Sequence, residues 1–214
     1  MPVKLERYSD QLKGICLIEE VGLSSNIYTI GENPITLIDT GVGSAPNKII
    51  PKLKLLNLTL QNITQVIITH AHYDHIGGLA EILQTVTPKI MAHSADAKLI
   101  EEAYSLEVVK LKDEDTITTQ VSSLKVIHTP GHTQGSICLY SPERKLLFSG
   151  DTVFADGGFG RTDLDTGDSE AMIKSLQHLT QFDVERLLPG HGDLVLQDAR
   201  EHIKNSFEEA QRIL

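Results

Sequence analysis

Three histidines and one aspartate crowd into a single short loop, and this cluster constrains the chain more than any other feature. The loop reads H-A-H-Y-D-H over residues 70–75, directly after the apolar run 66–68. Imidazole nitrogens and carboxylate oxygens are the ligands that suit zinc, iron and manganese. A loop at the end of a strand can turn several such side chains toward one point. The pattern therefore predicts a metal site rather than a polar loop that is merely rich in histidine.

The size and charge of the chain limit the classes of function that it can have. With 214 residues and 40% hydrophobic content, we expect one domain with a sizeable core spanning residues 1–214. The formal net charge is −10 and no run of lysine or arginine occurs, which argues against a nuclease and against a nucleic-acid partner. A small anionic substrate is still compatible with this charge, because metal cations can reverse the local field.

The chain carries no signal of secretion or membrane insertion. Charged residues interrupt the first 30 positions, and no segment approaches about 18 uninterrupted apolar residues. Cys16 and Cys138 lie in apolar surroundings without CxxC spacing, so we expect buried free thiols. We expect a cytoplasmic protein without a membrane partner, and a homodimer is compatible with the sequence.

We expect the two halves of the chain to contain similar successions of strands and helices. Strands are predicted at 14–20, 26–31, 35–39, 65–69, 89–92, 123–128, 136–140, 145–149 and 184–188. Helices are predicted at 46–57, 77–86, 94–104, 169–180 and 197–213. Strands grouped in each half with helices after them suggest an α/β fold in which two sheets pack face to face, with helices outside.

Four further loops that follow strands contain chemistry-bearing residues. They read L-I-D-T-G (37–41), T-P-G-H-T (129–133), S-G-D-T (149–152) and P-G-H-G (189–192). Their small residues let the backbone approach a metal closely. In this order, and together with the cluster at 70–75, they resemble the metallo-β-lactamase superfamily over residues 14–195. The resemblance implies an αββα four-layer sandwich with a dinuclear site at one edge.

The resemblance also implies which residues bind the ions. One metal would be held by His70, His72 and His132, the other by Asp74, His75 and His191, and Asp151 would bridge both. A water or hydroxide would be the second bridge, and Asp74 beside it would orient it as a catalytic residue. We expect two divalent ions per chain, zinc in first place, with iron or manganese accepted by the same ligands. Such ions lower the pKa of a shared water and polarise a carbonyl.

Several branches of the superfamily fit less well. True β-lactamases of this fold generally lack the bridging aspartate, so Asp151 argues against antibiotic hydrolysis as the main role. The flavodiiron branch resembles H-x-E-x-D-H, whereas residue 72 here is histidine. The tRNA-processing branch is usually longer and has an RNA-clamping arm.

Three interpretations remain open. The stretch G-F-G-R-T-D at 158–163 resembles short glyoxalase II-type hydrolases, the hydroxyacylglutathione hydrolases, which cleave an S-acyl thiol. It also resembles persulfide dioxygenases, which use a single iron held by two histidines and one aspartate. An acyl-homoserine-lactone lactonase shares all seven ligands but usually has a tyrosine where Phe154 is the nearest aromatic. We expect a metal-dependent hydrolase of a small-molecule thioester or lactone; a metal-binding module without turnover is a further alternative.

Substrate contacts are expected from loops. Full-length glyoxalase II carries a C-terminal helical domain that grips glutathione, and only 23 residues follow His191 here. We therefore expect the walls to come from segments 22–26, 73–78 and 152–163. Phe154, Phe159 and Arg161 are the candidate substrate-binding residues, and an apolar acyl chain would fit them better than a tripeptide anion. Arg161 would alternatively pair with Asp163.

Four other residues have two alternative roles each, one structural and one functional. Asp39 would either fix the tautomer of a ligand histidine or cap the turn before Gly41. His128 would either support the His132 loop or pack. For Tyr28 and Tyr73, packing is favoured over proton donation.

Overall fold

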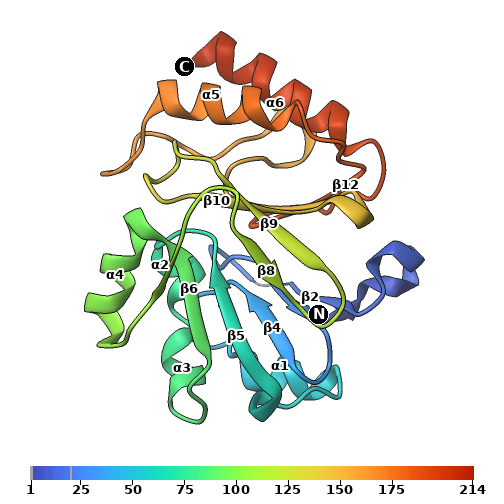
Figure 1. The fold of residues 1–214 in the computed structure, drawn as a ribbon, viewed down its shortest axis with the longest axis vertical. Helices are drawn as coiled ribbons and strands as arrows, with labels where there is room; N and C mark the ends of the chain where they lie inside the picture. Colours follow the sequence, from blue (N-terminus) through green and yellow to red (C-terminus); the bar gives the residue numbers. More distant parts are fainter. Residues whose placement is uncertain (1, 20) are drawn as a thin grey trace.

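Two β-sheets pack face to face at the centre of the molecule, and helices cover the outer face of each (Figure 1). This arrangement comes from a computed structural model that describes residues 2–19 and 21–214. The order of the layers is helix, sheet, sheet, helix, so the predicted αββα sandwich is confirmed.

The first sheet has seven strands in the order β1 to β7. Their bounds are Val3–Lys4, Ile15–Ile18, Ile27–Ile30, Ile35–Ile38, Ile63–Ile68, Lys89–His93 and Val109–Leu111. Strands β1 to β4 are antiparallel, and β4 to β7 are parallel to one another. The parallel strands read as nearly continuous apolar runs because both faces of the sheet are covered.

The second sheet has five strands in the order β12, β11, β10, β9, β8. Their bounds in chain order are Thr116–Thr118 (β8), Ser123–His128 (β9), Ile137–Ser141 (β10), Leu146–Gly150 (β11) and Arg186–Pro189 (β12). Only β11 and β12 are parallel. Each half of the chain thus supplies one sheet.

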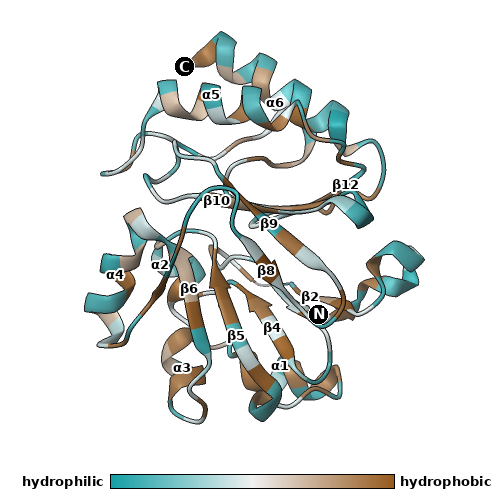
Figure 2. Cartoon of the chain, in the orientation of Figure 1, coloured by the Kyte–Doolittle hydropathy of each residue, from teal (hydrophilic) through white to brown (hydrophobic). Residues whose placement is uncertain are grey.

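Six α-helices complete the described fold. They are Ile49–Leu55 (α1), Tyr73–Ile76 (α2), Leu79–Leu83 (α3), Ser94–Tyr104 (α4), Ser169–Leu179 (α5) and Ala199–Ile213 (α6). Helix α6 buries Ala199, Ile203 and Ala210 on one face, at the spacing of an amphipathic helix. Figure 2 shows the result: the outward sides of α5 and α6 are hydrophilic, and the strands are hydrophobic.

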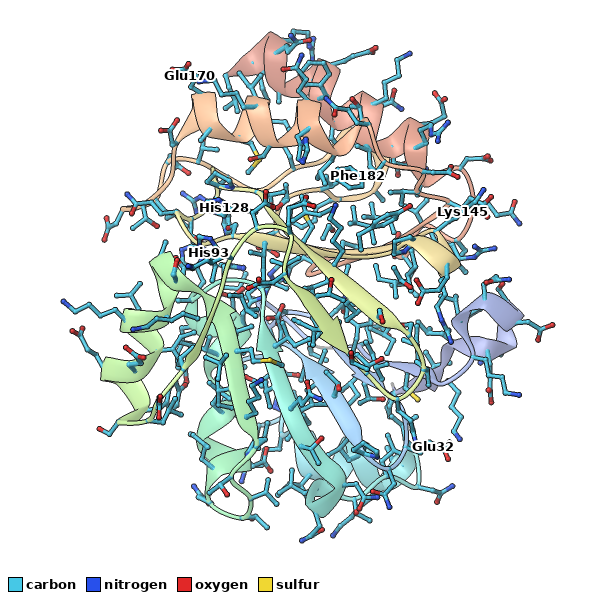
Figure 3. All side chains as sticks on the ribbon, viewed as in Figure 1. Glu32, His93, His128, Lys145, Glu170 and Phe182 are labelled. Carbon is cyan, nitrogen blue, oxygen red and sulfur yellow. The ribbon has the colours of Figure 1, made fainter. Side chains whose placement is uncertain are left out.

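Three apolar clusters hold the layers together. One lies between the sheets, where Tyr28 meets Phe148 edge to face with ring centroids 5.3 Å apart. The other two lie between each sheet and its own helices. His93, at the end of β6, stacks on His128, at the end of β9, with centroids 3.8 Å apart (Figure 3). This stack joins the two sheets.

Some elements differ from expectation. The helix expected at 77–86 is shortened to α3, and the preceding α2 was not foreseen; Gly77 and Gly78 lie between the two. There the backbone passes so close to the 40–42 segment that a Cβ on either glycine would collide with its carbonyls. The helix expected at 46–57 begins only at Ile49, and β1, β7 and β8 were not foreseen.

Two further features of the fold concern the cysteines and the length of the helices. Cys16 and Cys138 are buried free thiols, as predicted. Within the described residues, no helix has the length and apolar character needed to cross a bilayer.

Candidate metal centre

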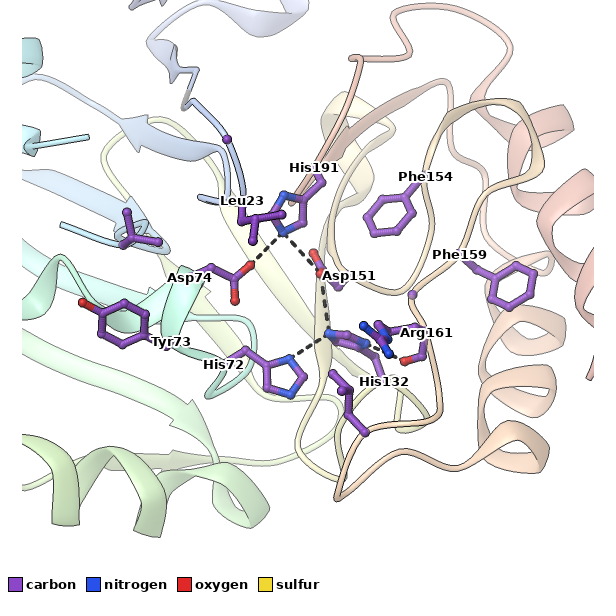
Figure 4. A pocket seen from close by; sticks show the side chains of 14 residues that line it. Leu23, His72, Tyr73, Asp74, His132, Asp151, Phe154, Phe159, Arg161 and His191 are labelled. Atoms are coloured by element: carbon purple, nitrogen blue, oxygen red, sulfur yellow. Dashed lines mark hydrogen bonds and ion pairs between the residues drawn. The ribbon is translucent and has the colours of Figure 1, made fainter. Parts of the chain in front are cut away.

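The seven predicted metal ligands come together at one edge of the sandwich. His70 and His72 follow β5, and Asp74 and His75 lie on α2 immediately after them. His132 lies between β9 and β10, Asp151 follows β11, and His191 follows β12. Because these strand ends meet at the same edge, residues from both halves of the chain converge there (Figure 4).

The first group of donors consists of His70, His72 and His132, whose candidate ligand atoms all lie within 4.8 Å of one another. His72 Nδ1 lies 2.9 Å from His132 Nε2. His132 donates from Nδ1 to the carbonyl of Arg161 at 2.7 Å, which leaves its Nε2 as a lone pair facing the group. This is a three-histidine arrangement typical of zinc.

The second group consists of Asp74, His75 and His191, within the same 4.8 Å limit. His191 Nε2 lies 3.0 Å from Asp74 Oδ2, and His75 Nε2 lies 3.6 Å from that oxygen. Both imidazoles therefore direct Nε2 toward one carboxylate.

Asp151 lies between the two groups. Its Oδ1 is 3.3 Å from His75 Nε2, and its Oδ2 is 3.5 Å from the Nε2 atoms of both His132 and His191. One carboxylate thus faces imidazoles of the first group and of the second. This is the position that a bridging ligand requires.

The buried donors fit a metal, because some of them have nothing else to bind. His70 Nε2, His75 Nε2 and Asp151 Oδ1 are buried and have no hydrogen-bond partner among the described residues. Leaving such atoms unpaired is costly, and a cation within the group would satisfy all three. The set of nitrogen and carboxylate donors matches zinc, iron or manganese.

Burial and neighbouring charges set the protonation of the ligands. Burial, together with the nearby histidines, lowers the pKa of His70 well below its usual value, and burial followed by His132 lowers that of His72. Burial alone would raise the pKa of Asp151, but His75, His191 and His132 together outweigh it and the pKa is lowered. The neutral imidazoles and the ionised carboxylate are the forms that coordinate metals.

His75 behaves differently from the other histidines. Burial opposes its charge, but the carboxylates of Asp151 and Asp39 prevail and raise its pKa well above the usual value. A proton on His75 therefore occupies the place that a cation would take.

Asp39 supports this ligand directly. It follows β4, is 1% exposed, and its Oδ2 accepts a hydrogen bond from His75 Nδ1 at 2.8 Å. Of the two roles considered for Asp39, the tautomer-fixing contact is present in the structure.

Asp96 is a supporting residue that sequence reasoning missed. This buried residue of α4 accepts the backbone N–H of Ala71, between His70 and His72, at 2.8 Å. The same Oδ2 accepts the hydroxyl of Thr133, next to His132, at 2.9 Å. One carboxylate thus ties together the two loops that carry the first donor group. Its only sequence signal is a carboxylate in the first turn of a helix that follows a strand, which is too common to be diagnostic.

Glycines beside the ligands allow their close approach. A Cβ on Gly190 would collide with Asp151 Oδ1 and crowd His75, and one on Gly160 would collide with the carbonyl of Asp151. These two loop positions therefore accept little else.

A cavity of about 750 Å³ opens in front of the ligands. The three predicted substrate-binding residues, Phe154, Phe159 and Arg161, all line it (Figure 4). The guanidinium of Arg161 is also paired with Asp163, with N···O distances of 2.7 and 2.8 Å. The pairing with Asp163 is thus present, and contact with a substrate stays a prediction.

The remaining candidates separate clearly. The buried Tyr28 donates its hydroxyl to the carbonyl of Pro189 at 2.7 Å, so it braces the His191 loop. Tyr73 is exposed and lines the cavity. His128 Nε2 donates to the carbonyl of Gln134 at 2.9 Å, which supports the turn after His132.

Comparisons with known proteins agree with this geometry. A family model described as the metallo-beta-lactamase superfamily matches residues 21–191. A beta-lactamase-like protein 2 homolog of Caenorhabditis elegans is 28% identical over 194 residues, which are 89% of this chain and 64% of the relative. A hydroxyacylglutathione hydrolase of Bartonella tribocorum is 38% identical over 136 residues, which are 64% of this chain and 50% of the relative.

A solved structure extends the similarity to three dimensions. The crystal structure of TTHA1623 in a di-iron-bound form has a TM-score of 0.68 and 29% identity, and the match covers 83% of this chain and 92% of that one. By contrast, the chain spans only half to about two thirds of the length of the two curated relatives. The matched family model covers most of the chain, including all seven ligand positions, and the chain belongs to the metallo-beta-lactamase superfamily.

Proposed function

We propose that the chain is a binuclear metal-dependent hydrolase that cleaves a small-molecule thioester, with a lactone as the second candidate. One observation carries the proposal. The Asp151 carboxylate lies within 3.5 Å of imidazole nitrogens from both three-residue donor groups. A site for a single ion would not need two complete groups with a shared carboxylate between them.

Each group has a defined task. His70, His72 and His132 would hold one ion, Asp74, His75 and His191 the other, and Asp151 both. Two divalent ions bound there would supply an acidified water and a Lewis acid for a carbonyl oxygen. Zinc is our first choice of metal, ahead of iron and manganese.

Asp74 is the residue that we assign to proton handling. Its carboxylate is partly exposed and borders the cavity. Burial tends to raise its pKa, but the hydrogen bond from His191 and the charges of His75 and His191 together lower it, so Asp74 is ionised at neutral pH. An ionised carboxylate at the cavity wall accepts a hydrogen bond from a water and so orients that water toward a bound carbonyl.

The leaving group favours a thioester. A thiol has a pKa near about 8.5 and departs as an anion at neutral pH, whereas an alkoxide needs a proton donor. Apart from the histidines, Tyr73 is the only phenol or other neutral acid among the described residues that line the cavity, and it is largely exposed. The Bartonella relative, named as a hydroxyacylglutathione hydrolase, supports the same choice.

The test is anaerobic turnover. Zinc-loaded protein should release thiol from a simple thioester without oxygen, because hydrolysis needs no redox-active metal. Asp74→Asn should lower kcat by about a hundredfold to ten-thousandfold, while the exposed control Asp193→Asn should not. Oxygen uptake with glutathione persulfide, confined to the iron form and without thioester cleavage by the zinc form, would show a persulfide dioxygenase instead.

A further inference from the structure

The cavity beside the candidate metal ligands has a largely apolar lining. Leu23, Val42, Tyr73, Phe154, Phe159 and Leu164 line it. They come from four separate segments of the chain: the β2–β3 loop, the β4–α1 loop, α2 and the long loop after β11. In Figure 4, Leu23 lies on one side of His191 and Phe154 on the other.

Several of these side chains are exposed, which is unusual for large apolar residues gathered in one place. Leu23 is 87% exposed, Tyr73 67% and Leu164 36%. Apolar side chains gathered around a cavity mark a ligand-binding site, because water contact there is unfavourable until a partner covers them. We therefore expect the exposed Leu23 to contact an apolar group of a bound ligand.

The charged residues beside the cavity also favour an uncharged ligand. Arg161 is the one lysine or arginine among the described residues that line the cavity. One edge of its guanidinium, Nε and Nη2, donates to the two carboxylate oxygens of Asp163. The hydrogen bond from Arg161 lowers the pKa of Asp163 to about 2, so the partner remains charged at neutral pH. The pair has no net charge with which to hold the carboxylates of a substrate.

We propose that the substrate carries an uncharged, apolar acyl chain seated against Leu23, Tyr73 and Phe154, and that the site does not grip an anionic tripeptide such as glutathione. This inference rests on the proposed thioester hydrolysis. It predicts that acyl length rather than the identity of the thiol decides the rate.

The first experiment is a series of N-acetylcysteamine thioesters from acetyl to octanoyl. Each methylene that is buried should raise kcat/KM by about threefold to fourfold until the wall is covered. In Leu23→Ser, the octanoyl-to-acetyl ratio should fall by about threefold to tenfold. Leu55→Ser is the matched control, because Leu55 is 70% exposed on α1 and does not line the cavity.

The second experiment removes the carboxylate that is paired with Arg161. In Asp163→Asn, kcat/KM for a succinyl thioester should rise several-fold relative to the octanoyl compound, because an unpaired guanidinium attracts the free carboxylate. Asp165→Asn removes the same charge from the same loop and should leave that ratio unchanged.

A binding measurement separates this inference from the proposed activity. The uncleavable S-octyl thioether of N-acetylcysteamine should bind with a negative heat-capacity change, as burial of apolar surface requires. That binding should weaken in Leu23→Ser and persist in Leu55→Ser.

The outcomes are distinct. Cleavage of all thioesters at equal rates, or a kcat/KM near about 10⁷ M⁻¹ s⁻¹ for S-lactoylglutathione, in the upper range for enzymes, would overturn the apolar-chain inference and leave hydrolysis standing. Binding of the octyl thioether without cleavage of any thioester would overturn the proposed activity and leave the apolar site standing.

Discussion

Asp39 Oδ2 lies 2.8 Å from Nδ1 of His75, and this one carboxylate determines which ring nitrogen faces the metal site. Asp39 also accepts the backbone N–H and the hydroxyl of Thr69, each at 2.8 Å. The carboxylate is therefore fixed before any ligand arrives. Because His75 donates through Nδ1, its Nε2 is directed at the group that contains Asp74 and Asp151.

Asp39→Asn should weaken metal binding by about ten- to a hundredfold, which is the usual effect of removing an outer carboxylate from a ligand histidine. The amide keeps the size of the side chain but not its charge, so the fold should persist. Competition with a chelator measures the affinity, and Asp193→Asn serves as the control. An unchanged affinity would reduce Asp39 to a turn residue.

The second prediction concerns Asp96 and the donor group of His70, His72 and His132. Because it joins the loop of His70 and His72 to the loop of His132, Asp96→Asn should loosen that group first. Thr133→Val removes only one of the two links and should have a smaller effect. Metal content after dialysis against dilute chelator should fall from about two ions toward one.

The readout for Asp96 must separate positioning from folding. Far-ultraviolet circular dichroism and the melting temperature of the metal-free variants report the fold, and the metal content reports the site. Equal loss of both ions, together with a collapsed melting temperature, would make Asp96 a general core residue.

The ligands were predictable because each lies in a recognisable loop. The cluster at 70–75 has four candidate donors, and the loops around His132, Asp151 and His191 each combine one donor with small neighbours; these local patterns survive folding. The alternation of strands and helices likewise reflects hydrophobic periodicity. These features depend on residues close in sequence.

The features that the sequence did not predict depend on contacts between residues far apart in the chain. The break between α2 and α3 arises where Gly77 and Gly78 press against the 40–42 segment, a contact that no local pattern shows. Asp96 reaches loops 25 and 37 residues away. The strands β7 and β8, with three residues each, form only through pairing with neighbours.

A third prediction concerns pH and the stacked pair of His93 and His128. Burial and then the neighbouring His128 lower the pKa of His93, against the opposing effect of Asp96 and Asp113. The folded state therefore takes up a proton at lower pH than the unfolded state. As the pH falls through the unfolded value of about 6.5, the free energy of unfolding should decrease, and the decrease should end once folded His93 is protonated.

His128→Gln tests that relationship. With one positive neighbour removed, the pKa of His93 should rise toward 6.5, and the loss of stability between pH 7.5 and 5 should shrink. Nuclear magnetic resonance titration of the His93 ring and urea unfolding at both pH values measure the two effects. A His93 that titrates identically in both proteins would contradict the electrostatic coupling.

The last prediction concerns the shared carboxylate. Within the described part of the chain, Asp151 is the one anionic side chain that faces imidazoles of both donor groups. In Asp151→Ala, two neighbouring cations would lose the anionic charge between them. We therefore expect metal content to fall from about two ions per chain to one or fewer, and thioesterase activity to fall with it by at least about a hundredfold. Elemental analysis after dialysis and a thiol-release assay on the same samples measure both. A fully active Asp151→Ala protein, or a wild-type protein that retains a single ion in excess metal, would contradict the binuclear assignment.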